Sequence, residues 1–144
     1  MKLTQLSVFL ENRPGRLHEL CETLSGEGIN ITTLSLADTE KFGILRLIVQ
    51  DVDRAKAALG AKGFVVKTSS VLAVEVSDEP GGLARILAVA EQGGLSVEYM
   101  YAFTIKSGGR GILVFRFDDT DRAIAALQAA KVNVLSSVDL FARV

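Results

Sequence analysis

The chain has little of the residue types from which catalytic and metal sites are usually built. Its 144 residues include one cysteine, Cys21, one histidine, His18, and no tryptophan. A single cysteine excludes a disulfide within the chain and a cysteine-based metal cluster. A single histidine excludes a Ser–His pair in each half and a multi-histidine metal site. We therefore expect no metal and no cofactor, with Cys21 filling core and His18 half-buried on a helix.

Long apolar runs and an excess of positive charge are also missing. The 16 lysine and arginine residues are balanced by 17 acidic residues, for a formal net charge of −1. No positive field therefore attracts a nucleic acid. No apolar run approaches the roughly 20 residues that span a bilayer, and residues 1–5 lack the apolar stretch of a signal peptide. We expect a cytoplasmic protein that binds neither nucleic acid nor membrane.

What the sequence does contain is an internal repeat. At an offset of 66 residues the two halves share identical residues: Leu6, Val8, Pro14, Gly15, Leu17 and Gly28 fall on Leu72, Val74, Pro80, Gly81, Leu83 and Gly94. Further along the offset becomes 68, where Gly43-Ile44-Leu45 meets Gly111-Ile112-Leu113. Such agreement predicts a duplicated unit of about 70 residues. We expect two domains, 1–70 and 71–144.

Each unit reads as strand, helix, two strands, helix, strand. The expected strands are 3–10, 29–37, 43–49 and 64–69, then 71–76, 95–105, 111–117 and 133–137, with hairpin turns at 38–41 and 106–109. Pro14 and Pro80 fit the first turn of the first helices, and Asp51 and Asp119 are placed to cap the second helices. The order predicts an α+β fold of two ferredoxin-like βαββαβ units, each an antiparallel sheet with its helices on one face.

The second expected strand of each unit is apolar on both faces. Leu34 and Leu36 have the opposite parity to Ile29 and Ile31, which indicates a sheet that is not open to water on its helix-free side. Units of 70 residues also bury a modest fraction of their surface alone. We expect the two halves to pack together and the chain to form a homodimer.

Residues 138–144 have no place in the repeat. Their apolar side chains fall on one parity, at Val138, Leu140, Ala142 and Val144. This period of two is typical of a half-buried strand. We therefore expect an extra C-terminal strand at 138–144, the alternative being a frayed end.

The loop between the first strand and the first helix of each unit is the best candidate for a binding site. It reads Glu11-Asn12-Arg13-Pro14-Gly15 in one unit and Ser77-Asp78-Glu79-Pro80-Gly81 in the other. A helix start can hold a carboxylate on its N–H groups, and glycine lets a ligand approach the main chain. Asn12 or Asp78 could accept a hydrogen bond from an ammonium group. On these residues alone, an ordinary turn with a helix cap is an equally good interpretation.

The stretch Leu-x-Val-x-Leu-Glu-Asn-Arg-Pro-Gly-x-Leu, a helix, and then Gly28-Ile29-Asn30-Ile31 resemble the ACT domain, the amino-acid-binding regulatory module of biosynthetic enzymes. The chain is especially similar to the serine-binding regulatory domain of phosphoglycerate dehydrogenase, although a ligand-binding histidine of that domain is replaced here by Leu10. The resemblance implies that Asn12 and Asn30, and in the second unit Asp78 and Ser96, contact a ligand between the loop of one domain and the second strand of a neighbour. The full set of expected binding residues is Asn12, Arg13, Pro14, Gly15, Asn30, Asp78, Pro80, Gly81 and Ser96.

The function implied by the resemblance is that of a regulatory sensor rather than an enzyme. It would bind an amino acid or related small carboxylate, signal through domain or subunit interfaces, and act in trans on a regulated enzyme. An acylphosphatase-like enzyme is one alternative, because such enzymes share this topology and use an arginine where Arg13 lies. Their Gly-rich phosphate loop is missing here, and Glu79 takes the place of Arg13 in the second unit. A ligand-free dimerisation scaffold is the other alternative.

Overall fold

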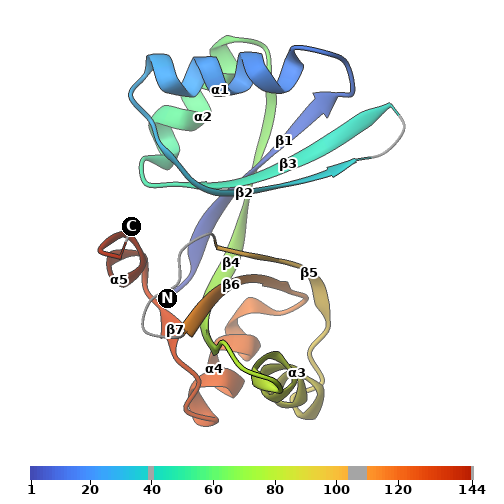
Figure 1. Ribbon diagram of the computed structural model, residues 1–144, viewed down its shortest axis with the longest axis vertical. Coiled ribbons are helices and arrows are strands. Elements are labelled where there is room, and N and C mark those ends of the chain that lie inside the picture. Colours follow the sequence, from blue (N-terminus) through green and yellow to red (C-terminus); the bar gives the residue numbers. More distant parts are fainter. Residues whose placement is uncertain (39–40, 104–109, 144) are drawn as a thin grey trace. The chain divides into compact units, whose positions relative to one another are not determined.

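The computed structural model describes residues 1–38, 41–103 and 110–143 (Figure 1). The predicted turn at 106–109, residues 39 and 40 of the other turn, and Val144 lie outside the described residues. The chain divides into two compact units. We call Thr4–Ser69 the N-terminal unit, and Ser70–Val144 together with Met1–Leu3 the C-terminal unit.

The N-terminal unit has the predicted order of elements. They are β1 (Leu3–Glu11), α1 (Arg16–Gly26), β2 (Ile31–Asp38), β3 (Phe42–Val49), α2 (Val52–Ala61) and β4 (Val65–Ser77), whose residues 65–69 belong to this unit. β1 and β2 each pair antiparallel with β3, and the strand order is β2-β3-β1-β4. Both helices lie on one face of the sheet (Figure 1).

The C-terminal unit repeats this arrangement around the second part of β4. Its further elements are α3 (Gly82–Gln92), β5 (Val97–Ala102), β6 (Arg110–Phe117), α4 (Thr120–Ala129), β7 (Val134–Leu135) and α5 (Ser137–Phe141). β6 and β7 pair antiparallel with β4, and β5 pairs antiparallel with β6. The predicted fold of two ferredoxin-like units is confirmed. The strands predicted at 64–69 and 71–76 are one continuous strand, because no glycine or proline interrupts β4.

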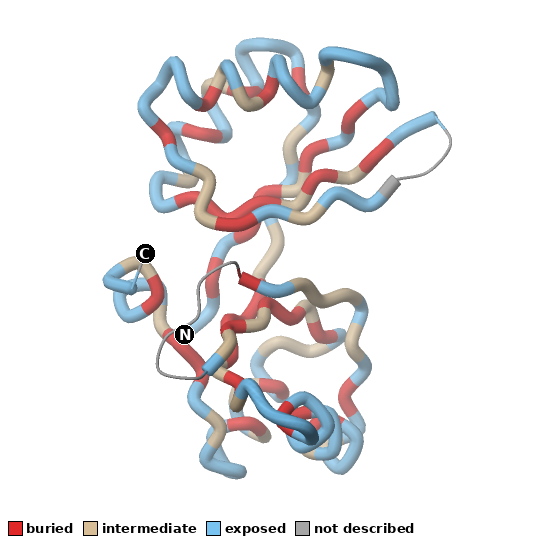
Figure 2. The backbone as a smooth tube through the Cα atoms, viewed as in Figure 1, coloured by how far each residue is buried: buried red, intermediate tan, exposed pale blue. Residues whose placement is uncertain are grey.

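The two cores use equivalent positions, which explains why the repeat is visible in the sequence. Each lies between the sheet and its helices, where buried residues alternate along the strands (Figure 2). The pairs related by the repeat include Leu6 and Leu72, Val8 and Val74, Leu20 and Ile86, Leu47 and Phe115, and Leu59 and Leu127. Cys21 packs partly buried against the first core. No helix of the described part of the chain is long and apolar enough to cross a membrane.

The helix starts differ in part from the prediction. Asp51 and Asp119 cap α2 and α4 as predicted, each accepting a hydrogen bond from the main-chain N–H three residues later. Pro14 and Pro80 lie in the turns before α1 and α3 rather than in the first helical turn. A glycine with positive φ follows each proline, and this left-handed residue ends the turn before the helix begins.

The prediction that Leu34 and Leu36 lie on the opposite face of the sheet from Ile31 is wrong. A β-bulge between Ile31 and Thr33 shifts the register, so Leu34 pairs with Leu47 and Leu36 with Leu45. Directly paired residues share a face, so both leucines lie on the helix-covered side. On the helix-free side of the C-terminal unit, Val71, Ala73, Ile112 and Val114 are at most 2% exposed. Tyr99 and Tyr101 lie on the same face and are half-buried, so this face is only partly closed to water.

The predicted C-terminal strand at 138–144 is wrong, because residues 137–141 form the helix α5. The Ser136 side chain accepts a hydrogen bond from the Asp139 N–H at 3.1 Å, and this cap starts the helix. Leu140 is fully buried, whereas Val138 is 77% exposed. His18 also differs from expectation, since its side chain is exposed and lies 3.2 Å from a Glu22 oxygen.

Candidate functional site

The β1–α1 loop of the N-terminal unit is an exposed turn with a defined set of contacts. The Asn12 N–H donates to the Lys41 carbonyl at 2.9 Å, which ties the loop to the start of β3. Arg13 Nε lies 3.0 Å from Glu11 Oε2, so the two charges of the loop form an ion pair. Gly15 has φ of 88° and precedes α1 directly. The predicted residues 12–15 therefore lie together on the surface.

The β4–α3 loop of the C-terminal unit has the same backbone but different charges. Gly81 has φ of 87° and precedes α3. Glu79, the counterpart of Arg13, lies 2.8 Å from Arg85 Nη2. Hydrogen bonds from Arg85 and Ser77 lower the pKa of Glu79 below its ordinary value. Asp78 and Pro80 are exposed beside it, so this loop is more acidic than its counterpart.

The first helix of each unit follows a glycine as its N-cap residue. Gly15 and Gly81 have no side chain that could accept a hydrogen bond from the first turn of α1 or α3. The other helices are capped by Asp51, Asp119 and Ser136. A helix start carries a partial positive charge and N–H groups that a carboxylate can accept from. The two candidate loops thus precede those helices of the described chain whose N-cap residue is a glycine.

A small pocket opens beside the N-terminal loop. Its volume is about 160 Å³, and it is lined by Leu10, Glu11, Asn12, Arg13, Leu17, Leu36 and Gly43. Polar residues of the loop and leucines of three different elements meet in it. The sequence analysis found the loop residues but not Leu17, Leu36 or Gly43. A glycine inside a strand, repeated at Gly111, was the available signal, because it marks close approach of another group.

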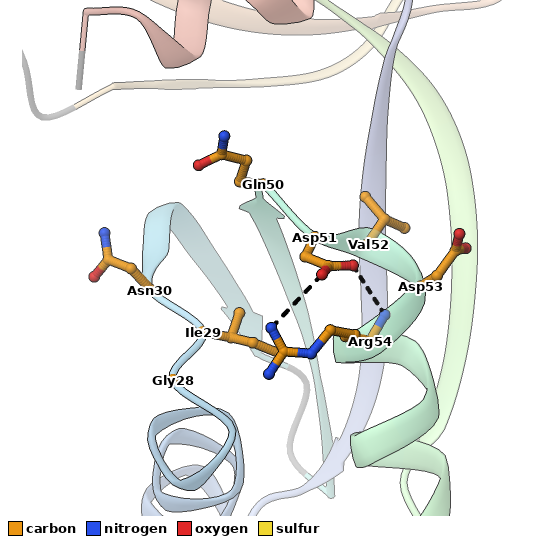
Figure 3. Close-up of a pocket in the computed structure, with 8 residues that line it drawn as sticks. All are labelled: Gly28, Ile29, Asn30, Gln50, Asp51, Val52, Asp53 and Arg54. Carbon is orange, nitrogen blue, oxygen red and sulfur yellow. Dashed lines mark hydrogen bonds and ion pairs between the residues drawn. The ribbon is translucent and has the colours of Figure 1, made fainter.

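Asn30 lies in a different pocket of the N-terminal unit (Figure 3). This pocket measures about 580 Å³ and is lined by Gly28, Ile29, Asn30, Gln50, Asp51, Val52, Asp53 and Arg54. Figure 3 shows Arg54 reaching toward Asp51, with 3.6 Å between Arg54 Nη1 and Asp51 Oδ2. Asn30 is exposed at its edge.

Asn12 and Asn30 lie at opposite ends of the sheet. Glu11, next to Asn12, pairs with Phe42 at one end of β3, and Ile31, next to Asn30, pairs with Val49 at the other. Seven residue steps along β3 correspond to about 23 Å. Asp78 and Ser96 of the C-terminal unit are separated in the same way. Their neighbours Ser77 and Val97 pair with the two ends of β6, at Arg110 and Phe117 respectively. Neither unit by itself brings its two predicted ligand contacts together.

The C-terminal unit has a pocket of its own near its loop, which sequence reasoning missed. It measures about 450 Å³, and Ser77, Gly82, Arg85, Arg110, Lys131 and Asn133 are among its lining residues. Three of these are cationic, in contrast to the leucine-lined pocket of the N-terminal unit. The two loops therefore adjoin pockets of different chemistry.

Comparison with known proteins places this arrangement in context. A family model described as an ACT domain pair matches residues 1–143. The crystal structure of protein BT0572 from Bacteroides thetaiotaomicron is 39% identical, covers 98% of this chain and 96% of its own, and superimposes with a TM-score of 0.92. No curated protein matches the chain.

Two further structures are similar in fold alone. The regulatory subunits of aspartate kinase from Thermus thermophilus and Thermus flavus are 18% and 15% identical, with TM-scores of 0.63 and 0.61. Each alignment covers 89% of this chain, with 90% and 92% of the respective subunits.

Proposed function

The chain belongs to the family of ACT domain pairs, and on that premise we propose that it is a non-catalytic regulatory sensor of an amino acid or a closely related small carboxylate. The ligand binds at the β1–α1 and β4–α3 loops. Binding changes an interface between domains or subunits, and the protein acts in trans on a regulated enzyme in the cytoplasm.

The observation that carries this proposal is the contrast between helices that start after an aspartate and helices that start after a glycine. α2 and α4 begin with an aspartate whose carboxylate accepts a main-chain N–H. α1 and α3 begin after a glycine, which has no side chain to make such a cap. A ligand carboxylate at α1 or α3 would take the place that Asp51 and Asp119 take elsewhere. Asn12 and Asp78 then provide oxygen acceptors for the ammonium group.

The separation of Asn12 from Asn30 supports a site that is shared between two copies of the chain. A free amino acid cannot span about 23 Å, so both asparagines can contact one ligand only if they come from different copies. β2 ends the strand order of the N-terminal unit, and its residues Leu34 and Leu36 are exposed. An open edge with exposed leucines favours pairing with another chain. We therefore propose a homodimer in which Asn12 of one copy and Asn30 of the other contact the same ligand, as the resemblance to the regulatory domain of phosphoglycerate dehydrogenase implies.

The acylphosphatase alternative has less support. Such an enzyme needs its arginine and asparagine on one phosphate, but Arg13 and Asn30 flank opposite ends of β3. Arg13 is also paired with Glu11. An acyl-phosphate hydrolysis assay on the full chain tests it directly, and the sensor proposal predicts no hydrolysis above the buffer rate.

Calorimetry with a panel of L-amino acids tests the sensor function. We expect saturable binding of at least one amino acid, weakened about tenfold or more by Asn12→Ala because a hydrogen bond to a charged group is worth about 1.5–3 kcal/mol. Lys56→Ala is the control, since Lys56 is exposed on α2 and lines neither the pocket beside the loop nor the pocket at Asn30. Absence of binding across the panel would leave the ligand-free scaffold as the better account.

A further inference from the structure

We propose that the N-terminal unit selects an amino acid with an aliphatic side chain, and that this side chain occupies the pocket formed by Leu10, Leu17, Leu36 and Gly43. The inference rests on the proposed function, because it names the class of ligand that the β1–α1 loop accepts.

Gly43 forms the floor of the pocket, and the space above it is open because glycine has no side chain. Gly43 pairs with Leu10 of β1, so a side chain at position 43 would point to the same, helix-covered face as Leu10. A Cβ atom built there would lie 3.2 Å from Leu36 Cδ1. Gly43 is not among the glycines with positive φ, so its backbone conformation does not require a glycine. The residue therefore keeps space open rather than serving an unusual backbone conformation.

The walls of the pocket are apolar. Leu10 is 3% exposed, whereas Leu17 and Leu36 are 36% and 49% exposed. An aliphatic group placed between the two exposed leucines would remove their surface and its own from water, which is favourable in proportion to the area covered. The volume of about 160 Å³ matches the size of a small hydrocarbon: an engineered cavity of about 150 Å³ lined by leucine, isoleucine and phenylalanine binds benzene.

The polar groups lie only at the loop side of the pocket. Glu11, Asn12 and Arg13 line it there, and α1 begins at Arg16 directly after the loop. An α-amino acid has its two charged groups on one carbon and its side chain on the same carbon. With its carboxylate at the start of α1 and its ammonium near Asn12, its side chain can enter the pocket between the leucines. The layout of the pocket thus fits the layout of the ligand.

The C-terminal unit lacks the outer wall of this pocket. Ala102 pairs with Leu113 as Leu36 pairs with Leu45, so Ala102 is the counterpart of Leu36. Val76 likewise replaces Leu10. The pocket near the second loop contains Arg85, Arg110 and Lys131 instead. The aliphatic preference is therefore a property of the N-terminal unit.

Calorimetry of the full chain with leucine, isoleucine, valine, alanine and serine tests the proposal. Each buried methylene strengthens binding roughly fourfold, so leucine should bind at least about tenfold more tightly than alanine or serine. If no amino acid binds, the proposed function fails. If alanine or serine binds as tightly as leucine, the function stands and the aliphatic selection is overturned.

Two variants locate the preference. Gly43→Val places a strand-favouring side chain on the floor and should reduce leucine affinity about tenfold or more. Gly111→Val is the matched control, because a Cβ at Gly111 meets nothing closer than the Val76 carbonyl at 4.0 Å, and it should leave leucine binding unchanged. Leu36→Ala, at an exposed position, should weaken leucine binding several-fold without affecting folding. Unchanged leucine affinity in the Leu36→Ala protein would overturn the assignment of this pocket. A Gly43→Val protein with unchanged leucine affinity and a changed oligomeric state would also overturn it, because the pocket would then hold a side chain of a second copy.

Discussion

Arg54 and Arg122 make the same contact in the two units. The Arg54 guanidinium donates to the carbonyl oxygen of Glu27, and the Arg122 guanidinium donates to that of Gly93. Glu27 and Gly93 are the C-cap residues of α1 and α3. The two arginines lie in the first turns of α2 and α4, three residues after the N-cap aspartates. Each arginine therefore links the end of one helix to the start of the next and fixes the helix pair over its sheet.

We expect Arg54→Ala to lower the free energy of unfolding by about 0.5–1.5 kcal/mol, because the main-chain carbonyl of Glu27 loses its donor but stays in contact with water. Urea denaturation measures this. Lys56→Ala, at an exposed position of the same helix, should change stability by less than about 0.5 kcal/mol. Equal effects of the two substitutions would show that the arginine link contributes nothing.

The tail provides a second test. Leu140→Ala should destabilise the C-terminal unit by about 2–5 kcal/mol, because Leu140 is fully buried and its loss leaves a cavity. Val138→Ala should be nearly neutral, since Val138 is 77% exposed. Thermal unfolding of both variants distinguishes the helix from the alternating strand predicted from the sequence, in which Val138 and Leu140 would be equally important.

Glu75 makes the tail sensitive to acid. Its carboxylate accepts from Asn133 Nδ2 at 2.6 Å and from Arg143 Nη1 at 2.9 Å, and its side chain is 11% exposed. The hydrogen bond from Asn133, and then Arg143, lower the pKa of Glu75 below its ordinary value of 4.5. A lowered pKa stabilises the folded state above that ordinary value, and the stabilisation is lost as the pH falls through the folded pKa.

We therefore expect Glu75→Gln to be clearly less stable than the wild type at about pH 7, and the difference to shrink as the pH falls below 4.5. Urea midpoints measured at about pH 7 and at a series of pH values below 4.5 test this. A difference that stays constant across this range would contradict the role assigned to the ionised carboxylate.

Two glycines should respond in opposite directions to alanine. Gly15→Ala should cost about 1–2 kcal/mol, because φ is 88° although a Cβ there meets nothing within 4 Å. Gly60→Ala should stabilise by about 0.5–1 kcal/mol, because Gly60 lies in α2 with no atom within 4 Å of the added Cβ. Thermal melts compare them. Two changes of the same sign would contradict the assigned backbone geometry.

The fold could be predicted from the sequence because the repeat places equivalent core residues, helix caps and turn glycines in step. The caps Asp51 and Asp119 were correct for this reason, since capping depends on neighbours within one turn. The tail was missed because its alternation was preferred to the local pattern Ser136-x-x-Asp139, in which a serine caps a helix three residues before an acidic residue.

The remaining errors have a common origin in strand pairing. The bulge between Ile31 and Thr33 moves Leu34 and Leu36 to the other face, and it is defined only by the register against β3. The pocket over Gly43 depends on the same register, because its walls come from β1, β2 and α1. The loops were found by local signals, whereas the distance between Asn12 and Asn30 required the strand order.

The shared ligand site is tested most directly by mixing two defective chains. Asn12→Ala and Asn30→Ala are each expected to bind the ligand weakly. In a two-fold dimer, Asn12 of one copy and Asn30 of the other would form each site. A dimer of one Asn12→Ala chain and one Asn30→Ala chain then has one site that lacks both asparagines and one site that retains both. Calorimetry on an equimolar, re-equilibrated mixture should then recover wild-type affinity at about a quarter of the N-terminal sites. A mixture that binds no better than the separate variants would contradict a site built from two copies.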